Sequence, residues 1–521
     1  MTTRRSFLAT AAMSAFAQAA KRPNILIISC ENLSPTLGCY GDANASTPAL
    51  DAFAASAMRF DRAYAVSGIG PVSRSAIQTG MFPSTLGTHT GGSAVLPSFV
   101  KTFSELLRAA GYHIYAPKKS RPADAPLFRW IRLDATNPSR IRLRGEAYDR
   151  TVKPLRPEQR KSPNQLPFPP QFEDSEEARR DWANGYEMTT LLDRQFAARL
   201  KELTEPTVVA FFSEYGFTLR EGNSAAYESG TRVPLLIRLP EASEGKVDSQ
   251  LVMLLDLAPT LLNLAGVEVP GHMQGRAFSG PRLSPPRRFV FATCDRPDDR
   301  YELVRSVRDA RYRYVRNFTR GTEELFDSKA DPNEVKPVSD AAVQARLKER
   351  SERWRDDTRD LGLLPEADLA VREAALGTRY KVGRQQGFES LVQKLTEIAS
   401  TNDGTKIREA FADDDAAVRA WAVMRKPQTA PRSLLADVSG AVRMSLAKSL
   451  RKSDLKDAEA LKVLLRGLRS SEEWVRMLAV LAFDEIGAND LPVMTALQAM
   501  AKVEKNRAVA AVVARATKGS A

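Results

Sequence analysis

Apolar runs alternate with helical patterns from residue 22 to about residue 290, and this alternation allows few architectures. Residues 25–29 and 208–212 are short β-branched or aromatic runs that predict buried strands. Residues 104–110 carry the apolar spacing of a helix. The pattern predicts an α/β sheet with helices on both faces. In such sheets ligands bind at the carboxyl ends of the strands, which is where Glu31-Asn32 and Glu214-Tyr215 fall.

The pattern changes twice after this region. With 521 residues the chain is too long for one compact domain, so we expect two or three. Residues 286–375 predict a small α+β unit, with strands near 288–293 and 311–316 and a helix near 341–359. From about residue 385 strand signals stop and amphipathic helices follow one another. Three segments that start at Val418, Val442 and Val475 share a core of Val-Arg, two variable residues and a small or apolar residue.

These segments predict an all-α region of HEAT-like helical repeats over residues 385–518. Helical pairs of this kind bury a face only by stacking, so they form a short solenoid that can hold a protein partner. A generic helical bundle without a partner is the alternative interpretation.

The N-terminus has the pattern of an export signal. Thr3-Arg4-Arg5-Ser6-Phe7-Leu8 precedes a weakly apolar run to Ala20, which predicts a twin-arginine signal peptide over residues 1–20. An ordinary amphipathic helix is the alternative. The run is too short to cross a bilayer, and no other segment reaches about 18 apolar residues. We therefore expect a periplasmic or secreted bacterial protein with no integral membrane segment.

The net charge limits the expected binding partners, and the cysteine content limits the expected disulfides and metal sites. The net charge is +13, and nucleic acid is not an expected partner in the periplasm. A sulfated polysaccharide or another anionic surface fits this positive field, but so does a generally basic, soluble surface. Cys30, Cys39 and Cys294 cannot pair completely and lack the spacing of a metal clip. A Cys30–Cys39 disulfide is one interpretation, and a buried free thiol at Cys30 is the favoured one.

One stretch carries a family resemblance. Residues 70–80 read Gly-Pro-Val-Ser-Arg-Ser-Ala-Ile-Gln-Thr-Gly, which resembles the sulfatase signature Cys/Ser-x-Pro-x-Arg followed by Thr-Gly. Further blocks that resemble this family follow in order: residues 22–28, 37–42, 47–51, 81–83, 213–216, 227–234, 256–262, 273–276 and 324–334. The 37–42 and 80–83 blocks are most similar to the heparan N-sulfatase-like branch.

The resemblance implies a fold and an activity. It implies an alkaline-phosphatase-like α/β domain over residues 21–285 and the small C-terminal subdomain over 286–375. It also implies hydrolysis of sulfuric esters in sulfated glycans with the help of calcium. In active sulfatases the first signature position becomes formylglycine, whose hydrate attacks the sulfate. Here that position is Gly70, which has no side chain to oxidise, so formylglycine is not possible there.

The resemblance also assigns the other site residues, several of them changed. Arg74 and Lys119 correspond to sulfate-binding cations, with Lys118 as the alternative to Lys119. A later family lysine falls at Asn223. The chain has only three histidines, His89, His113 and His272. His89 lies in a block where active relatives carry a functional-looking polar residue, and a structural role is the alternative. His113 resembles a strand residue.

The corresponding calcium ligands are Glu31, Asn32 and Glu214, a degenerate set. Asn32 lacks a charge, and Tyr215 stands where a second ligand of the pair belongs. Calcium takes six to eight oxygen ligands, so this set binds it weakly at best. In the alternative interpretation, which is slightly favoured, Glu31 and Glu214 pair with Arg74 or Lys119.

The leading hypothesis is an exported sulfatase-family protein that binds sulfated glycans, with hydrolysis lost or strongly impaired. Loss of a nucleophile costs several orders of magnitude in rate, and loss of ligands as well leaves little activity. Two alternatives remain. One is an active sulfatase of a sulfated polysaccharide that uses a divalent cation. The other is a protein-docking module that acts through the helical repeats.

Overall fold

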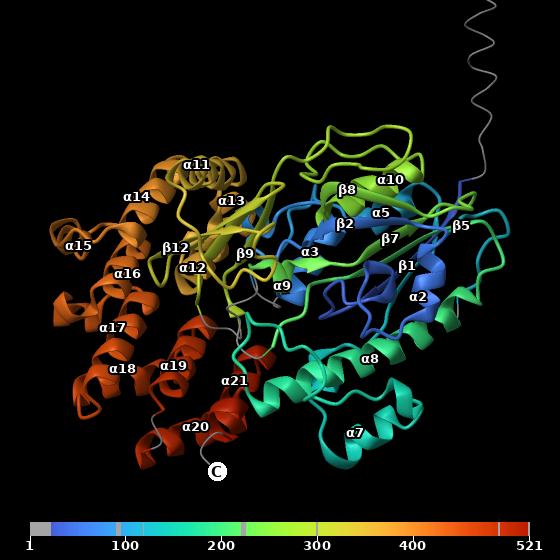
Figure 1. Ribbon diagram of the computed structural model, residues 1–521. Coiled ribbons are helices and arrows are strands. Elements are labelled where there is room, and N and C mark those ends of the chain that lie inside the picture. Colours follow the sequence, from blue (N-terminus) through green and yellow to red (C-terminus); the bar gives the residue numbers. More distant parts are fainter. Residues whose placement is uncertain are drawn as a thin grey trace, which may run out of the picture.

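The computed structural model describes residues 22–89, 95–117, 119–219, 226–297, 301–487 and 490–518. The predicted signal peptide over residues 1–20 therefore lies outside the described residues. In Figure 1 an α/β body lies on one side, a smaller sheet lies in the middle, and a helical tail forms the opposite side. The three parts follow one another along the chain.

The body is built on a mixed sheet of eight strands. The strand order is β3-β4-β1-β5-β7-β2-β6, and β8 pairs with β2. β1 lies between β4 and β5 and is parallel to both. Every residue of β1 and β5 is buried, as expected for parallel strands that are covered on both faces. The strands are β1 (Asn24–Cys30), β2 (Met58–Tyr64), β3 (His113–Ile114), β4 (Leu127–Arg132), β5 (Thr207–Ser213), β6 (Arg232–Val233), β7 (Leu235–Arg238) and β8 (Lys246–Met253).

Helices cover both faces of this sheet. Alternate residues of β1 point to opposite faces, so Ile25 and Ile27 pack with α3, α5 and α10, while Leu26 and Ile28 pack with α2 and α8. The predicted α/β organisation and both predicted strands are therefore confirmed. The helices of the body are α2 (Pro48–Ala54), α3 (Gly70–Thr79), α4 (Pro83–Leu86), α5 (Phe103–Ala109), α6 (Pro138–Ile141), α7 (Gly145–Val152), α8 (Glu176–Leu200), α9 (Glu228–Thr231) and α10 (Leu257–Leu264).

The second part is an antiparallel sheet with the order β12-β11-β10-β9. α11 (Ala341–Thr358) packs against it, and its Trp354 stacks on Phe291 of β9. The strands are β9 (Val290–Cys294), β10 (Val304–Arg308), β11 (Tyr312–Asn317) and β12 (Thr322–Asp327).

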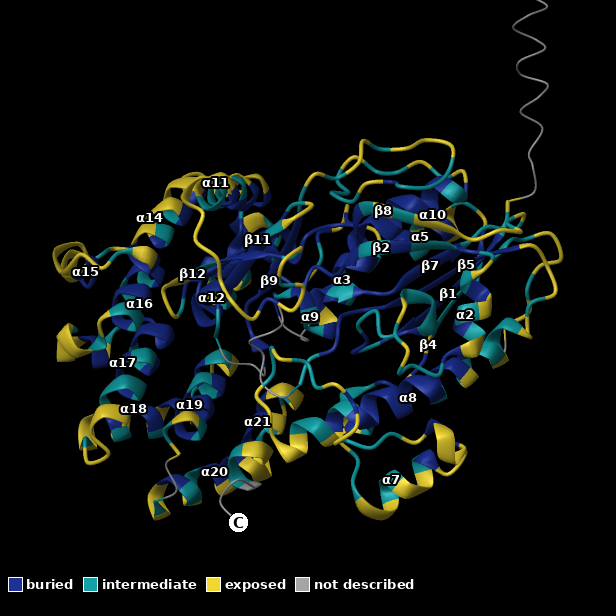
Figure 2. Cartoon of the chain, viewed as in Figure 1, coloured by how far each residue is buried: buried dark blue, intermediate teal, exposed yellow. Residues whose placement is uncertain are grey.

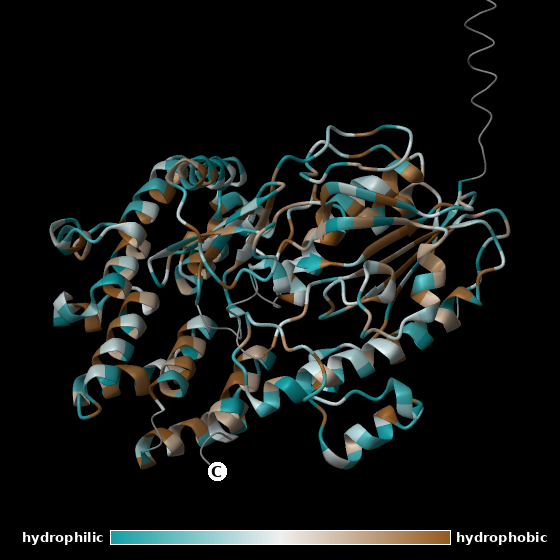
Figure 3. Ribbon diagram, in the orientation of Figure 1, coloured by the Kyte–Doolittle hydropathy of each residue, from teal (hydrophilic) through white to brown (hydrophobic). Residues whose placement is uncertain are grey.

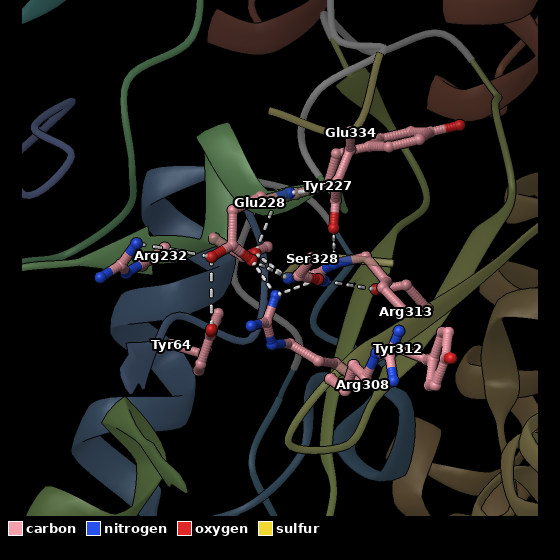
Figure 4. Close-up of polar contacts among 12 residues, drawn as sticks. Tyr64, Tyr227, Glu228, Arg232, Arg308, Tyr312, Arg313, Ser328 and Glu334 are labelled. Carbon is pink, nitrogen blue, oxygen red and sulfur yellow. Dashed lines mark hydrogen bonds and ion pairs between the residues drawn. The ribbon is translucent and has the colours of Figure 1, made fainter. Parts of the chain in front are cut away.

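A buried ion-pair network joins this sheet to the body (Figure 4). Glu228 of α9 accepts hydrogen bonds from Arg308 and Arg313, each at 2.7 Å. Arg313 also donates to Glu334 at 2.7 Å, and Tyr64 of β2 donates to Glu228 at 3.3 Å. The Tyr-Glu-x-Gly-x-Arg-x-Pro block at residues 227–234 therefore holds two sheets together.

The third part contains helices only, apart from short 3₁₀ turns. Its helices are amphipathic, with apolar residues facing inward and polar residues outward (Figures 2 and 3). Their core is continuous with Leu303 and Phe318 of the second sheet. The helices are α12 (Glu366–Leu376), α13 (Arg379–Val382), α14 (Phe388–Ser400), α15 (Gly404–Ala410), α16 (Ala416–Arg425), α17 (Gly440–Ser453), α18 (Ala458–Gly467), α19 (Glu473–Ile486), α20 (Leu491–Val503) and α21 (Arg507–Lys518).

The structure also tests the expectations about the cysteines and about membrane-spanning segments. Cys30, Cys39 and Cys294 are free, so the Cys30–Cys39 disulfide is not formed and Cys30 is the buried thiol that was favoured. Burial raises the pKa of Cys30 to about 12, which keeps it a neutral thiol. Over the described ranges, every helix is too short or too polar to span a bilayer.

Candidate functional site

Three segments meet at the carboxyl edge of the parallel strands. Glu31 follows β1, Glu214 follows β5, and Arg74 lies on the first turns of α3. Nη2 of Arg74 lies 2.5 Å from Oε1 of Glu31 and 2.7 Å from Oε2 of Glu214, and Nε also donates to Glu214 at 2.9 Å. The guanidinium group thus bridges the two carboxylates, which is one of the two arrangements that the sequence left open.

Glu214 is fully buried and has further partners. Ser29 donates to its second carboxylate oxygen at 3.0 Å, and Trp130 in turn donates to Ser29 at 2.9 Å. Burial raises the pKa of Glu214 above its ordinary value, while the hydrogen bond and the charge of Arg74 act in the opposite direction. Arg74 therefore offsets part of the cost of burying this carboxylate, but not all of it.

Glu31 is held from a different side. Nδ2 of Asn137 donates to its Oε2 at 2.9 Å, and Thr136 donates to its backbone carbonyl at 2.6 Å. Arg132, the last residue of β4, lies 3.8 Å from both Glu31 and Glu214 and is half exposed. The carboxylates therefore face two guanidinium groups, one partly buried and one half exposed at the mouth of the site.

Tyr215 fills the space in front of Gly70. A Cβ atom built on Gly70 would lie 2.9 Å from Cε1 of Tyr215 and 3.6 Å from Oε1 of Glu31. The first distance is shorter than side chains tolerate, so the tyrosine ring occupies the place of a side chain at position 70. Burial also raises the pKa of Tyr215 well above its ordinary value, so the phenol stays neutral.

Asn32 is buried directly after Glu31 and adopts a left-handed backbone conformation with φ of 55°. Its side-chain oxygen accepts a hydrogen bond from the backbone N–H of Thr218 at 2.8 Å. A residue with a short polar side chain tolerates this conformation. The amide oxygen is thus used to fix the chain after β5.

This donor set does not fit calcium. Arg74 binds both carboxylates, and the backbone N–H of Thr218 binds the side-chain oxygen of Asn32, so these oxygen atoms are already engaged, whereas calcium takes six to eight oxygen ligands. Within the described ranges, no group of three or more His, Cys, Asp or Glu residues could hold a metal ion. Glu31 and Glu214 are thus paired with Arg74 and are not arranged around a cation site.

The structure does not bring all the predicted residues together. Lys119 is exposed in the segment between β3 and β4, and the ion pairs of Glu31 and Glu214 among the described residues are made by arginines instead. Lys118 and Asn223 lie outside the described residues. His89 is buried 3.4 Å from Asp295 of the second sheet, away from the Arg74 ion pair, and His113 begins the short strand β3.

Sequence reasoning missed Arg132, Asn137 and Arg142. Arg142 is exposed, and its charge lowers the pKa of Tyr215 against the larger effect of burial. Arg132 could have been found, because it ends a strand that pairs with β1 and so reaches the same edge of the sheet. Asn137 and Arg142 flank the short helix α6 after that strand, where no local motif indicates their position.

Two family models match the chain. The model described as Sulfatase matches residues 23–121 and 167–267, and the model described as N-sulphoglucosamine sulphohydrolase, C-terminal, matches residues 222–357. The chain belongs to the sulfatase family. The matched segments contain Glu31, Gly70, Arg74 and Glu214, whereas α6, α7 and the helices after α11 lie outside them.

Curated sulfatases from two bacteria are similar to this chain over most of their own length. An ulvan-active sulfatase of Formosa agariphila is 26% identical over 460 residues, which cover 67% of this chain and 77% of that protein. A Delta 4,5-hexuronate-2-O-sulfatase of Bacteroides thetaiotaomicron is 25% identical over 448 residues, which cover 67% of this chain and 92% of that protein.

Solved structures confirm the expected sulfatase fold. A structure in complex with its substrate D-glucosamine-2-N,6-O-disulfate has a TM-score of 0.51 at 20% identity and covers 65% of this chain and 98% of its own. The phosphonate monoester hydrolase of Agrobacterium radiobacter has a TM-score of 0.52 at 18% identity, covering 66% and 98%. About a third of this sulfatase-family chain has no counterpart in either.

Proposed function

We propose that this sulfatase-family protein binds sulfated glycans and has lost the hydrolysis of their sulfate esters. The observation that carries the proposal is the ring of Tyr215 in front of Gly70. A side chain at position 70 and this ring exclude each other, so the nucleophile is absent and its space is filled. The bridging position of Arg74 between Glu31 and Glu214 supports the same conclusion.

Charge at the mouth of the site supports an anionic ligand. Arg74 and Arg132 lie against the two carboxylates, and Arg142 adds a third positive charge near Tyr215. Arg132 and Arg142 are accessible to solvent, and a guanidinium group binds the oxygen atoms of an anion in a fork geometry. The similarity to an ulvan-active sulfatase favours a sulfated polysaccharide as the source of that anion.

The proposal includes the parts of the chain outside the matched segments. Residues 1–20 serve as a twin-arginine signal, so the protein works in the periplasm or outside the cell, where polysaccharides are met. Helices α14 to α21 are HEAT-like repeats that extend the sulfatase fold. We also assign the chain to the heparan N-sulfatase-like branch. The family model that matches residues 222–357 supports this, because it is described as the C-terminal part of N-sulphoglucosamine sulphohydrolase.

The glycan proposal is tested by calorimetric titration of the purified chain with ulvan and with heparin, which measures the affinity for each polysaccharide. We expect the double variant Arg132→Ala/Arg142→Ala to weaken binding by about tenfold or more, because it removes the exposed charge-assisted contacts. The variant Arg346→Ala/Arg353→Ala on α11 is the control, since it removes the same charge at a distant surface. Equal weakening by both variants would indicate a general charge effect and reject the site.

A further inference from the structure

A cavity of about 200 Å³ lies between the second sheet and the helical tail. Its walls come from Arg296, Tyr301 and Thr319 beside the second sheet, from the start of α12, and from helices α16, α17 and α19. No residue of the Arg74 site contributes to it. The larger apolar side chains of the lining include Tyr301, Met424, Met444, Trp474, Met477 and Leu481. Pockets for small molecules are common at junctions between structural units such as this one.

The lining favours an aromatic ligand. Met444 and Met477 are buried at the base, while Trp474 and Met424 are only partly buried. Thioether sulfur atoms contact aromatic rings favourably, and the unbranched methionine side chain adapts to the shape of what it binds. The tryptophan and tyrosine rings add edge and face contacts of the same kind.

The charged residues around the cavity are already paired. Arg296 lies 3.1 Å from Glu366, and its guanidinium group covers the ring of Tyr301 at 4.1 Å. Lys448 lies 2.7 Å from Glu485 at the more exposed side. A charged ligand would enter an apolar space with no free counter-charge, which costs free energy. The cavity therefore suits an uncharged molecule.

Its volume limits the size of that molecule. An apolar protein cavity of about 150 Å³ holds benzene, and pockets for drug-sized ligands begin at about 300 Å³. We propose that this cavity binds a free, uncharged aromatic compound of one or two rings. This site is independent of the glycan site, and neither proposal needs the other.

Indole is the probe, and the ε-methyl NMR signals of labelled methionines in the full chain are the readout. We expect saturable shifts of the Met444 and Met477 signals. Ala482→Phe fills the cavity from α19, and Ser445→Phe narrows it from the less buried side of α17. Each should raise the Kd of indole by at least about tenfold, which is about 1.4 kcal/mol. Ala499→Phe on the exposed side of α20 is the matched control and should leave the Kd unchanged.

Indole-3-acetate tests the charge argument, and its Kd should be at least about tenfold higher than that of indole. If Ala482→Phe does not fold, Ser445→Phe alone decides the outcome. Absence of saturable shifts at millimolar indole would overturn the proposal. So would equal Kd values in the control and in the variants that fill the cavity, because binding would then lie elsewhere.

Discussion

At the scale of single residues, the ring of Tyr215 packs against Gly70 and leaves no room for a side chain there. Gly70 begins α3, and Tyr215 follows β5, so their contact joins two segments about 145 residues apart in the sequence. The ring lies where a side chain at position 70 would project. The loss of the nucleophile and the presence of the tyrosine are therefore structurally linked, and a side chain restored at position 70 alone creates strain.

Gly70→Ala tests this contact. Alanine in a helix is ordinarily more favourable than glycine by up to about 1 kcal/mol. At position 70 the added methyl group meets the buried ring, so we expect a net loss of about 1–3 kcal/mol in the free energy of unfolding. Gly404→Ala, at the first residue of α15, is the control, because a Cβ there meets only an arginine nitrogen at 3.5 Å.

Urea denaturation of both variants gives the measurement. In the double variant Gly70→Ala/Tyr215→Ala the two changes should couple, with the cost of Gly70→Ala reduced once the ring is removed. If Gly70→Ala proves as stabilising as Gly404→Ala, the ring does not occupy the nucleophile's place.

The sequence allowed part of this site to be predicted. The absent nucleophile could be read from residue 70 alone, because the motif around it is local. The pairing of Glu31 and Glu214 with Arg74 remained one of two alternatives, because it depends on where a helix packs against two strand ends. The position of the Tyr215 ring, and the approach of Arg132 and Arg142, depend on tertiary packing that no spacing along the chain reveals.

At the scale of elements, buried polar contacts fix the tail helices to one another. Asp368 of α12 accepts a hydrogen bond from Ser439, the N-cap residue of α17, at 2.8 Å. Its second oxygen is buried with no hydrogen-bond partner among the described residues. Burial raises the pKa of Asp368 to about 6, because the ionised form loses its hydration.

This shift predicts a pH dependence of stability. The folded chain keeps a proton on Asp368 at pH values where the unfolded chain has released it, so the free energy of unfolding falls as pH rises from about 4 to about 6. The contribution is roughly 2–3 kcal/mol, and it is constant outside this window. Asp368→Asn cannot ionise, so it should lack this part of the pH dependence.

Denaturation of the wild type and of Asp368→Asn at pH 4 and pH 7 measures the difference. Asp414→Asn, at an exposed aspartate of the same region, is the control and should behave as the wild type. The same pH dependence in Asp368→Asn as in the wild type would contradict the assignment.

The strands and helices themselves were easier to predict than the contacts that they make with one another. The strands at 25–29 and 208–212 and the helix at 104–110 appear as β1, β5 and α5, because their patterns are local and regular. The change to helices after residue 385 was equally visible. The network of Glu228, Arg308 and Arg313 was not, since charged residues on a strand pattern give no sign that they will be buried together (Figure 4).

At the scale of the whole molecule, the tail and the sulfatase fold share one core. Leu303, Phe318 and Leu361 belong to the same buried cluster as the helices from α14 onward. Trp421 of α16 is fully buried and donates to the carbonyl of Leu363 at 2.7 Å. The tail is therefore a fixed extension of the second sheet.

A chain truncated after residue 383 should expose this core. We expect it to bind anilinonaphthalene sulfonate and to associate in size-exclusion chromatography, because a large apolar surface loses its cover. The full-length chain under the same conditions is the control. A truncated chain that remains monomeric and unfolds cooperatively would show that the tail is a separate domain.

The most direct test of the central claim is sulfate release from ulvan and heparin, measured by ion chromatography after long incubation with the purified chain and calcium. The closed site predicts no sulfate above the level found with the Glu214→Gln variant, although the wild type binds both polysaccharides. Sulfate release by the wild type that Glu214→Gln abolishes would show that this site still catalyses hydrolysis, and it would contradict the account.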